Sequence, residues 1–129
     1  MQLSDLNLNY HKPVMIWLLL LTTMVFLIII IGGLTRLTDS GLSMVDWRPL
    51  LGTIPPLNKS QWIEIFKAYK QTPEFLYVNK NMSLEEFKYI FWWEWFHRFF
   101  ARLIGIVFLF PFIYFYFKKY LNIFFYKRF

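Results

Sequence analysis

Two long apolar segments separated by a polar connector dominate the pattern of the chain. Residues 14–31 are apolar except for two threonines, and residues 13–35 carry no charge. A helix of this length reaches across the roughly 30 Å of bilayer hydrocarbon, whereas the core of a cleaved signal peptide is usually only about 7–15 residues long. We therefore predict a retained transmembrane helix at residues 13–34. The glycine pair 32–33 is typical of a helix end, and residues 38–41 (TDSG) are typical of a tight turn.

The second apolar segment is longer and starts with a helix-capping motif. Residues 83–86 (SLEE) have the pattern of a capping box, in which the Ser and Glu side chains bind free N–H groups at a helix start. Inside the segment, Pro111 has no N–H to donate to the carbonyl of Val107, four residues earlier. We predict one helix over residues 83–117, about 52 Å long, of which the part from about 97 to 117 crosses the membrane.

The charges between and after these segments predict an orientation. Residues 36–86 carry six basic and six acidic residues, whereas residues 118–129 carry four basic and none acidic. Cytoplasmic flanks of membrane proteins are enriched in Lys and Arg. This favours a cytoplasmic tail at 118–129, both termini in the cytoplasm, and an external connector at 35–82. The N-terminal flank has no Arg, unlike a mitochondrial transit peptide, so a bacterial inner (plasma) membrane is favoured, with the mitochondrial inner membrane as the alternative.

The connector itself contains a predicted amphipathic helix, at residues 60–69. Trp62, Ile65, Phe66 and Tyr69 recur at helical spacing and therefore share one face. Such a face lies on the bilayer surface or on the helices beneath it, or it forms a lid over a buried site. The pattern alone leaves both interpretations open.

Composition narrows the class of protein. Hydrophobic residues make up 57% of the 129 residues and aromatic residues 23%, which excludes a disordered chain and an ordinary soluble domain. The net charge of +6 comes from scattered or juxtamembrane residues, so nucleic-acid binding is not indicated. There is no Cys, which excludes a disulfide scaffold, a thiolate zinc site and a cysteine nucleophile. We predict a single all-α membrane domain over residues 1–129, with two transmembrane helices.

Ionisable residues within the second apolar segment are the main candidates for chemistry. Glu94, His97 and Arg98 are three and four residues apart and therefore approach one helical face, and Arg102 follows one turn later. Ionisable groups at membrane depth are expensive and mark functional sites by default. The alternative is structural: Glu94 and Arg98 pair with each other, and His97 extends to the interface.

The chemistry open to this set is limited. A neutral imidazole in aromatic surroundings suits the axial position of haem iron, which makes His97 a candidate metal ligand. Arg98 and Arg102 match carboxylates such as haem propionates, and Arg36 lies at the same outer interface as His97. Glu94 is a candidate for orienting water or handling protons. No second His or Cys accompanies His97, which argues against a zinc site.

Six stretches of the sequence form a specific set of motifs. They are residues 32–47 (GGLTRLTDSGLSMVDW), 55–56 (PP), 73–75 (PEF), 82–88 (MSLEEFK), 94–98 (EWFHR) and 102–105 (RLIG). Together they closely resemble the haem A synthase family, in its alphaproteobacterial and mitochondrial branch. The absence of Cys fits this branch, because some other members carry a cysteine pair in the external loop.

The resemblance implies a fold of eight transmembrane helices in two similar four-helix bundles, each holding a haem between two histidines. It implies oxidation of a methyl group of haem O to the formyl group of haem A for cytochrome oxidase. By motif position, His97 resembles the first histidine of the substrate-side pair and Glu94 the glutamate needed for methyl oxidation. Haem b would bind in the C-terminal half. The implied partners are haem O, the bilayer, the remaining helices of the enzyme, haem O synthase and further copies of the enzyme.

The chain departs from the family in having two spans rather than eight. We therefore expect it to be an N-terminal portion of such an enzyme, forming part of its first bundle and inactive alone. One alternative is a non-catalytic haem-binding protein in which two copies of His97 form a bis-histidine site across a homodimer. Another is a purely structural two-span protein in which the Glu94–Arg98 pair anchors an interface.

Overall fold

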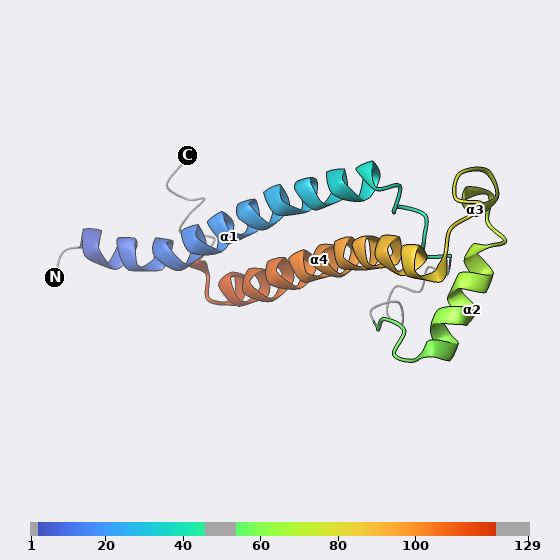
Figure 1. The fold of residues 1–129 in the computed structure, drawn as a ribbon. Helices are drawn as coiled ribbons and strands as arrows, with labels where there is room; N and C mark the ends of the chain where they lie inside the picture. The colour runs from blue at the N-terminus through green and yellow to red at the C-terminus, as the bar shows by residue number, and fades with distance from the viewer. Residues whose placement is uncertain (1–2, 46–53, 121–129) are drawn as a thin grey trace. The chain divides into compact units, whose positions relative to one another are not determined.

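Four α-helices make up most of the described chain (Figure 1). They are α1 (Leu3–Leu37), α2 (Lys59–Tyr69), α3 (Pro73–Tyr77) and α4 (Leu84–Phe117). The computed structural model describes residues 3–45 and 54–120, with side chains from residue 12 onward. No strand occurs among these residues. The end of the first family motif, residues 46–47, and the tail beyond residue 120 lie outside the described residues.

The two long helices have the length and composition of membrane spans. In α1 the stretch Lys12–Leu37 is long and apolar enough to cross a membrane, and in α4 the whole helix is. Both keep large apolar side chains exposed; Leu19 on α1 is 69% exposed and Phe110 on α4 is 68% exposed. Helices that are apolar on all sides need lipid or further helices around them. The fold is therefore that of an all-α membrane protein.

The ends of α1 differ from the sequence pattern. The helix begins ten residues before the predicted span and passes through Pro13, which removes only one helical hydrogen bond. It also continues through the glycine pair 32–33 to Leu37, so the expectation that these glycines end the helix is wrong. The left-handed residue after the helix is Asp39, with φ 49°. Aspartate tolerates this backbone conformation better than most residues, because its short polar side chain can bond locally.

The contacts divide the chain into two units, each of which is described separately. One unit comprises the described residues of Met1–Leu27 and Ala101–Phe129. Its core forms where Trp17 of α1 meets Phe115 of α4, with ring centroids 5.5 Å apart. The indole Nε1 of Trp17 donates to the Val107 carbonyl at 2.8 Å. This is the carbonyl that loses its helical partner because of Pro111, so Trp17 supplies the missing donor.

The other unit comprises Ile28–Phe100 and has an aromatic core. The buried members of this core come from α2, α3 and the first turns of α4: Phe66, Tyr69, Phe75, Phe87, Ile90 and Phe91. Trp62 and Ile65 pack against the edge of the cluster. The apolar face of α2 therefore lies on the helices beside it, which decides between the two interpretations of the amphipathic pattern in favour of packing.

Side-chain caps set the helix starts in this unit. The Ser83 backbone N–H donates to Glu86 Oε2 at 2.7 Å, and the Glu86 N–H donates to Ser83 Oγ at 3.3 Å, which confirms the capping box. Helix α2 begins at Lys59, one residue earlier than expected, because Asn58 Oδ1 accepts from the Gln61 N–H at 2.9 Å. An asparagine cap satisfies one of the free N–H groups of the first turn.

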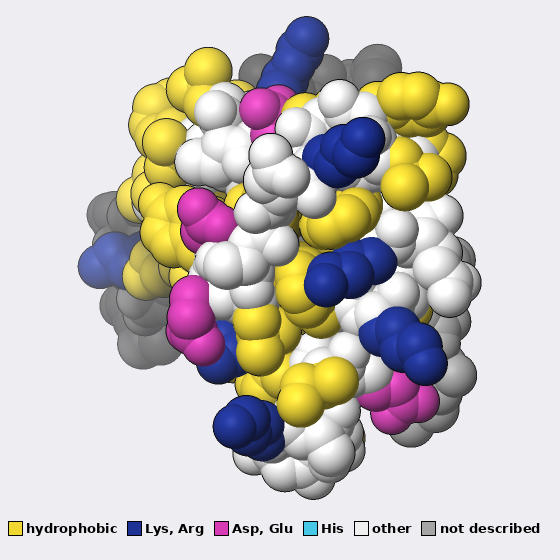
Figure 2. Space-filling view, turned by 45° about the vertical axis from the view of Figure 1, so that its right-hand side comes forward, with side chains coloured by type: hydrophobic (Ala, Val, Ile, Leu, Met, Phe, Trp, Pro, Cys, Tyr) yellow, Lys and Arg dark blue, Asp and Glu magenta, His cyan; other side chains and the backbone are white. Residues whose placement is uncertain are grey.

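Charged side chains of both signs occur on the surface. Figure 2 shows Lys and Arg side chains interspersed with Asp and Glu side chains, and with hydrophobic ones, on the face that it presents. Residues 36–86 carry equal numbers of acidic and basic residues.

Candidate functional site

A polar cavity lies in the unit Ile28–Phe100, at the end of α1. Its volume is about 560 Å³, within the range of small-molecule sites. The lining comes from the last turn of α1, the turn that follows it, α3 and the middle of α4: Thr35, Arg36, Asp39, Gly41, Leu42, Glu74, Glu94, His97 and Arg98. None of these described lining residues belongs to α2. Four of the five predicted site residues meet here.

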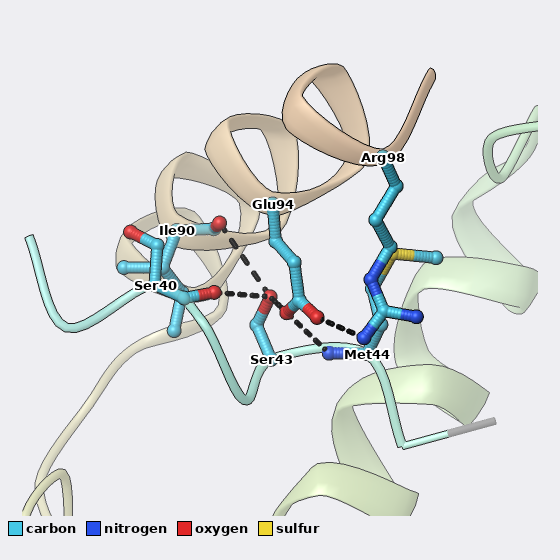
Figure 3. Close-up of polar contacts among 6 residues, drawn as sticks. All are labelled: Ser40, Ser43, Met44, Ile90, Glu94 and Arg98. Atoms are coloured by element: carbon cyan, nitrogen blue, oxygen red, sulfur yellow. Dashed lines mark hydrogen bonds and ion pairs between the residues drawn. The ribbon is translucent and has the colours of Figure 1, made fainter. Parts of the chain in front are cut away.

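Glu94 is the most buried ionisable residue of the cavity, with 3% of its surface exposed. Its Oε2 accepts from the Ser43 hydroxyl at 2.6 Å and from the Met44 N–H at 2.9 Å (Figure 3). Its Oε1 accepts from Arg98 Nη2 at 2.5 Å. Both carboxylate oxygens therefore accept hydrogen bonds, and each of the three partners acts as a donor.

The pairing of Glu94 with Arg98 was the structural alternative raised by the sequence, and the structure contains it. The pair does not occupy the whole guanidinium group, because arginine carries five N–H donors and only Nη2 binds Glu94. The Arg98 side chain is 26% exposed and lines the cavity, so donors remain for an anionic group there. Pairing and ligand binding are therefore compatible for this residue.

His97 is half-buried and lines the cavity rather than facing bulk solvent. Its imidazole packs against α1 at Gly32: a β-carbon at Gly32 would lie 3.4 Å from His97 Cε1 and 3.5 Å from Nε2. The glycine therefore leaves space beside the ring where any other residue would place a side chain. This close approach, rather than a helix end, is the structural role of Gly32.

The predicted arginines divide between the two units. Arg36, in the last turn of α1, is exposed and lines the cavity. Arg102 belongs to the other unit, where its Nη1 is buried and has no hydrogen-bond partner among the described residues. The structure therefore brings Arg36 and Arg98 together with His97, and it assigns Arg102 to the other unit.

The turn after α1 supplies partners that the sequence did not predict. Ser43 and the backbone of Met44 bind Glu94 across about fifty residues of sequence. The turn is held by its own bonds: the Ser40 N–H donates to the Thr35 carbonyl at 2.9 Å, and the hydroxyls of Thr38 and Ser40 are 2.6 Å apart. The only signal for Ser43 was its place within residues 32–47, which does not indicate what a hydroxyl contacts.

The described residues contain no group of three or more His, Cys, Asp or Glu side chains that could hold a metal ion by themselves. The arrangement instead offers one imidazole, two guanidinium groups and the buried carboxylate of Glu94 around a single cavity, with the carboxylates of Asp39 and Glu74 also on its lining. Such a set can bind an anionic ligand, supply one axial nitrogen to a metal already held in a macrocycle, and accept a proton.

Comparisons with known proteins identify the family. Residues 15–128 match the model of the Cytochrome oxidase assembly protein family. The chain is 53% identical over 118 residues to a protein of Nitrosospira multiformis named Heme A synthase, covering 92% of this chain and 33% of the relative.

Two further relatives carry the same name. One, from Paramagnetospirillum magneticum, is 56% identical over 110 residues, covering 85% of this chain and 31% of the relative. The other, from Flavobacterium psychrophilum, is 50% identical over 114 residues, covering 87% and 34%. The chain thus spans about a third of the length of the curated relatives it matches, and no solved structure matches it significantly. The resemblance stated from the motifs is confirmed, and the chain belongs to the Cytochrome oxidase assembly protein family.

Proposed function

We propose that this chain is the haem O-binding part of a haem A synthase, an oxidoreductase that converts a methyl group of haem O to the formyl group of haem A. The family match and the relatives named Heme A synthase support this function. The observation that carries it is the cavity that gathers Arg36, Glu94, His97 and Arg98 at the end of α1. The chain spans about a third of its relatives, so the remaining helices of the enzyme complete the site.

A haem fits the residues around the cavity. A β-carbon at position 32 would lie 3.5 Å from His97 Nε2, and the glycine leaves this side of the ring without a side chain from that position. His97 would then be a ligand of the iron of haem O, together with a histidine elsewhere in the enzyme. Arg36 and the unused donors of Arg98 would bind the propionates, with Arg102 as a further candidate. Haem b would be held by the C-terminal half.

Glu94 would handle protons during the oxidation. Replacing C–H bonds of a methyl group by a C=O bond releases protons, and the oxygen atom and the electron acceptor must come from outside this chain. The Glu94 carboxylate accepts hydrogen bonds from three donors, which hold it at the wall of the cavity. We assign it the role of base at the wall of the cavity. Bound haem O supplies the oxidisable methyl group, and His97 and the arginines fix its orientation.

The setting follows from the same proposal. Family membership and two apolar helices indicate a membrane protein. We assign it to the bacterial inner membrane, with both termini cytoplasmic because residues 118–129 are basic. Haem O synthase is the class of enzyme that would deliver the substrate, and a homo-oligomer is the expected assembly.

The test uses the complete reading frame that contains these residues, expressed in a host that makes haem O but lacks its own haem A synthase. Haems extracted from the purified protein are separated by chromatography. We expect haem A from the wild type, loss of haem O and haem A but not of haem b with His97→Ala, and bound haem O without haem A for Glu94→Ala. The matched control is Glu85→Ala, since Glu85 lies on the same helix but pairs with Lys88 at the surface.

Other outcomes would reject the proposal. Haem A formation by Glu94→Ala at the wild-type level removes Glu94 from the reaction. Bound haem without haem A in the wild type favours the non-catalytic haem carrier. Absence of haem from the wild type leaves only a structural role for the Glu94–Arg98 pair.

A further inference from the structure

The hydroxyl of Ser43 reaches Glu94 from a different part of the chain. Ser43 lies in the turn after α1 and is 1% exposed, and its Oγ donates to Glu94 Oε2 at 2.6 Å (Figure 3). This is the shorter of the two bonds that Oε2 accepts; the other, from the Met44 N–H, is 2.9 Å long. Because both donors come from consecutive residues, the turn fixes one oxygen of the carboxylate while Arg98 binds the other.

The Ser43 hydroxyl has alternative acceptors within reach. The Ser40 carbonyl lies 3.3 Å from Oγ and the Ile90 carbonyl 3.5 Å from it. A hydroxyl group has a single proton, which rotates to the best acceptor, so the short bond to Glu94 competes with the two longer ones. If Glu94 moves or takes up a proton, the hydroxyl can turn to a carbonyl without leaving a buried donor unsatisfied. The Met44 N–H is fixed in the backbone and has no such freedom.

The geometry points to Ser43 as a positioning residue for the oxidation of haem O: it aims the Glu94 carboxylate at the cavity and releases it when Glu94 accepts a proton. This inference rests on the proposed function, and it adds a residue outside the Glu94–His97–Arg98 motif. Ser43 does not line the cavity among the described residues, so it acts through Glu94 rather than on the substrate. Without the hydroxyl, the carboxylate keeps Arg98 and Met44 as partners but loses its shortest bond from the turn.

The test compares Ser43→Ala with Thr38→Val in the complete enzyme. Thr38→Val removes a hydroxyl from the same turn, and that hydroxyl binds Leu34, Thr35 and Ser40 rather than Glu94. Two quantities are measured on purified protein: total haem per polypeptide, and the ratio of haem A to haem O. A residue that only stabilises the turn changes the first quantity, whereas a positioning residue changes the second.

We expect Ser43→Ala to keep its bound haem and to lower the ratio of haem A to haem O roughly tenfold, the order expected from the loss of one hydrogen bond to a charged group. Thr38→Val should leave the ratio unchanged. Ser43→Thr retains the hydroxyl and should restore most of the ratio. If Ser43→Ala does not accumulate in the membrane, Ser43→Cys carries the same expectation, because a thiol fills the same space and donates only weakly.

Two results would overturn the inference while leaving the proposed function intact. One is a wild-type ratio in Ser43→Ala, or in Ser43→Cys where the alanine variant is absent, alongside an inactive Glu94→Ala. The other is an equal loss of haem content and ratio in Ser43→Ala and Thr38→Val. A wild-type protein that forms no haem A refutes the proposed function itself, and the role of Ser43 with it.

Discussion

Replacing Trp17 by Phe tests how the proline in α4 is accommodated. Pro111 cannot donate to the Val107 carbonyl, and Trp17 Nε1 donates to that oxygen at 2.8 Å, a normal length for a good N–H···O bond. In hydrocarbon there is no water to take over, so a carbonyl left without a partner is costly. Trp17→Phe keeps an aromatic ring beside Phe108 and Phe115 but removes the donor.

The magnitude follows from the type of contact. Hydrogen bonds between transmembrane helices contribute about 0.6 kcal/mol on average and up to about 1.7 kcal/mol. Loss of the larger indole ring adds a packing cost, so the single substitution does not isolate the bond. Pro111→Ala supplies a backbone N–H that can donate to Val107 in the ordinary helical way. In the Pro111→Ala background, Trp17→Phe should therefore lower the free energy of unfolding by about 1 kcal/mol less than it does in the wild type.

A double-mutant cycle measures this difference. The four proteins are wild type, Trp17→Phe, Pro111→Ala and the double variant, unfolded in mixed micelles by increasing SDS. Far-UV circular dichroism follows the unfolding, because tryptophan fluorescence would change with the substitution itself. Effects that add to within about 0.3 kcal/mol would show that Trp17 does not replace the bond lost at Pro111.

Three further predictions concern the unit Ile28–Phe100. Gly32→Ala should retain haem, because its β-carbon would make an ordinary contact of 3.4 Å with the His97 ring. The extra carbons of Gly32→Val should displace the ring and reduce the amount of bound haem seen in the reduced-minus-oxidised spectrum. Retention of haem by both variants would contradict the packing of His97 against Gly32. Asn58→Ala removes the cap of α2 and should lower the free energy of unfolding by about 1 kcal/mol in denaturant titrations, and an unchanged midpoint would count against the cap. Burial raises the pKa of Tyr69 above its ordinary value of 10.0, so the folded protein keeps a proton that the unfolded chain loses, and stability should fall as the pH rises above about 10. Tyr69→Phe should lessen this alkaline loss when melting temperatures at about pH 9 and about pH 11 are compared, and an equal loss in both proteins would be contrary to the prediction.

Local features of the sequence were sufficient to predict the two long helices and the start of the second one. The capping box at Ser83 and Glu86 depends on residues three apart, and the helix it starts continues for 34 residues. The apolar runs gave two membrane helices, because length and hydropathy are properties of continuous sequence. The i, i+4 spacing of Glu94 and Arg98 likewise raised their pairing as the structural alternative, and the structure contains this contact within one helix.

Other features depended on contacts that local patterns do not contain. The glycine pair suited a helix end, yet Gly32 lies within α1 where the His97 ring packs, sixty-five residues away along the chain. The apolar face of α2 fitted both a lid and a packed helix, and the aromatic cluster around Tyr69 decided the matter. Arg102 has the same spacing from Arg98 as Arg98 has from Glu94, yet it belongs to the other unit.

The residues of this chain thus determined by themselves that it is a helical membrane protein with an ionisable cluster on one helix, because hydropathy and helical periodicity act over a few turns. Only the tertiary structure decided what surrounds that cluster. The turn that carries Ser43 and Met44 binds Glu94, and Gly32 borders His97. Hydrogen bonds and close packing between distant segments depend on where the backbone turns, and the sequence pattern of each segment alone does not specify that position.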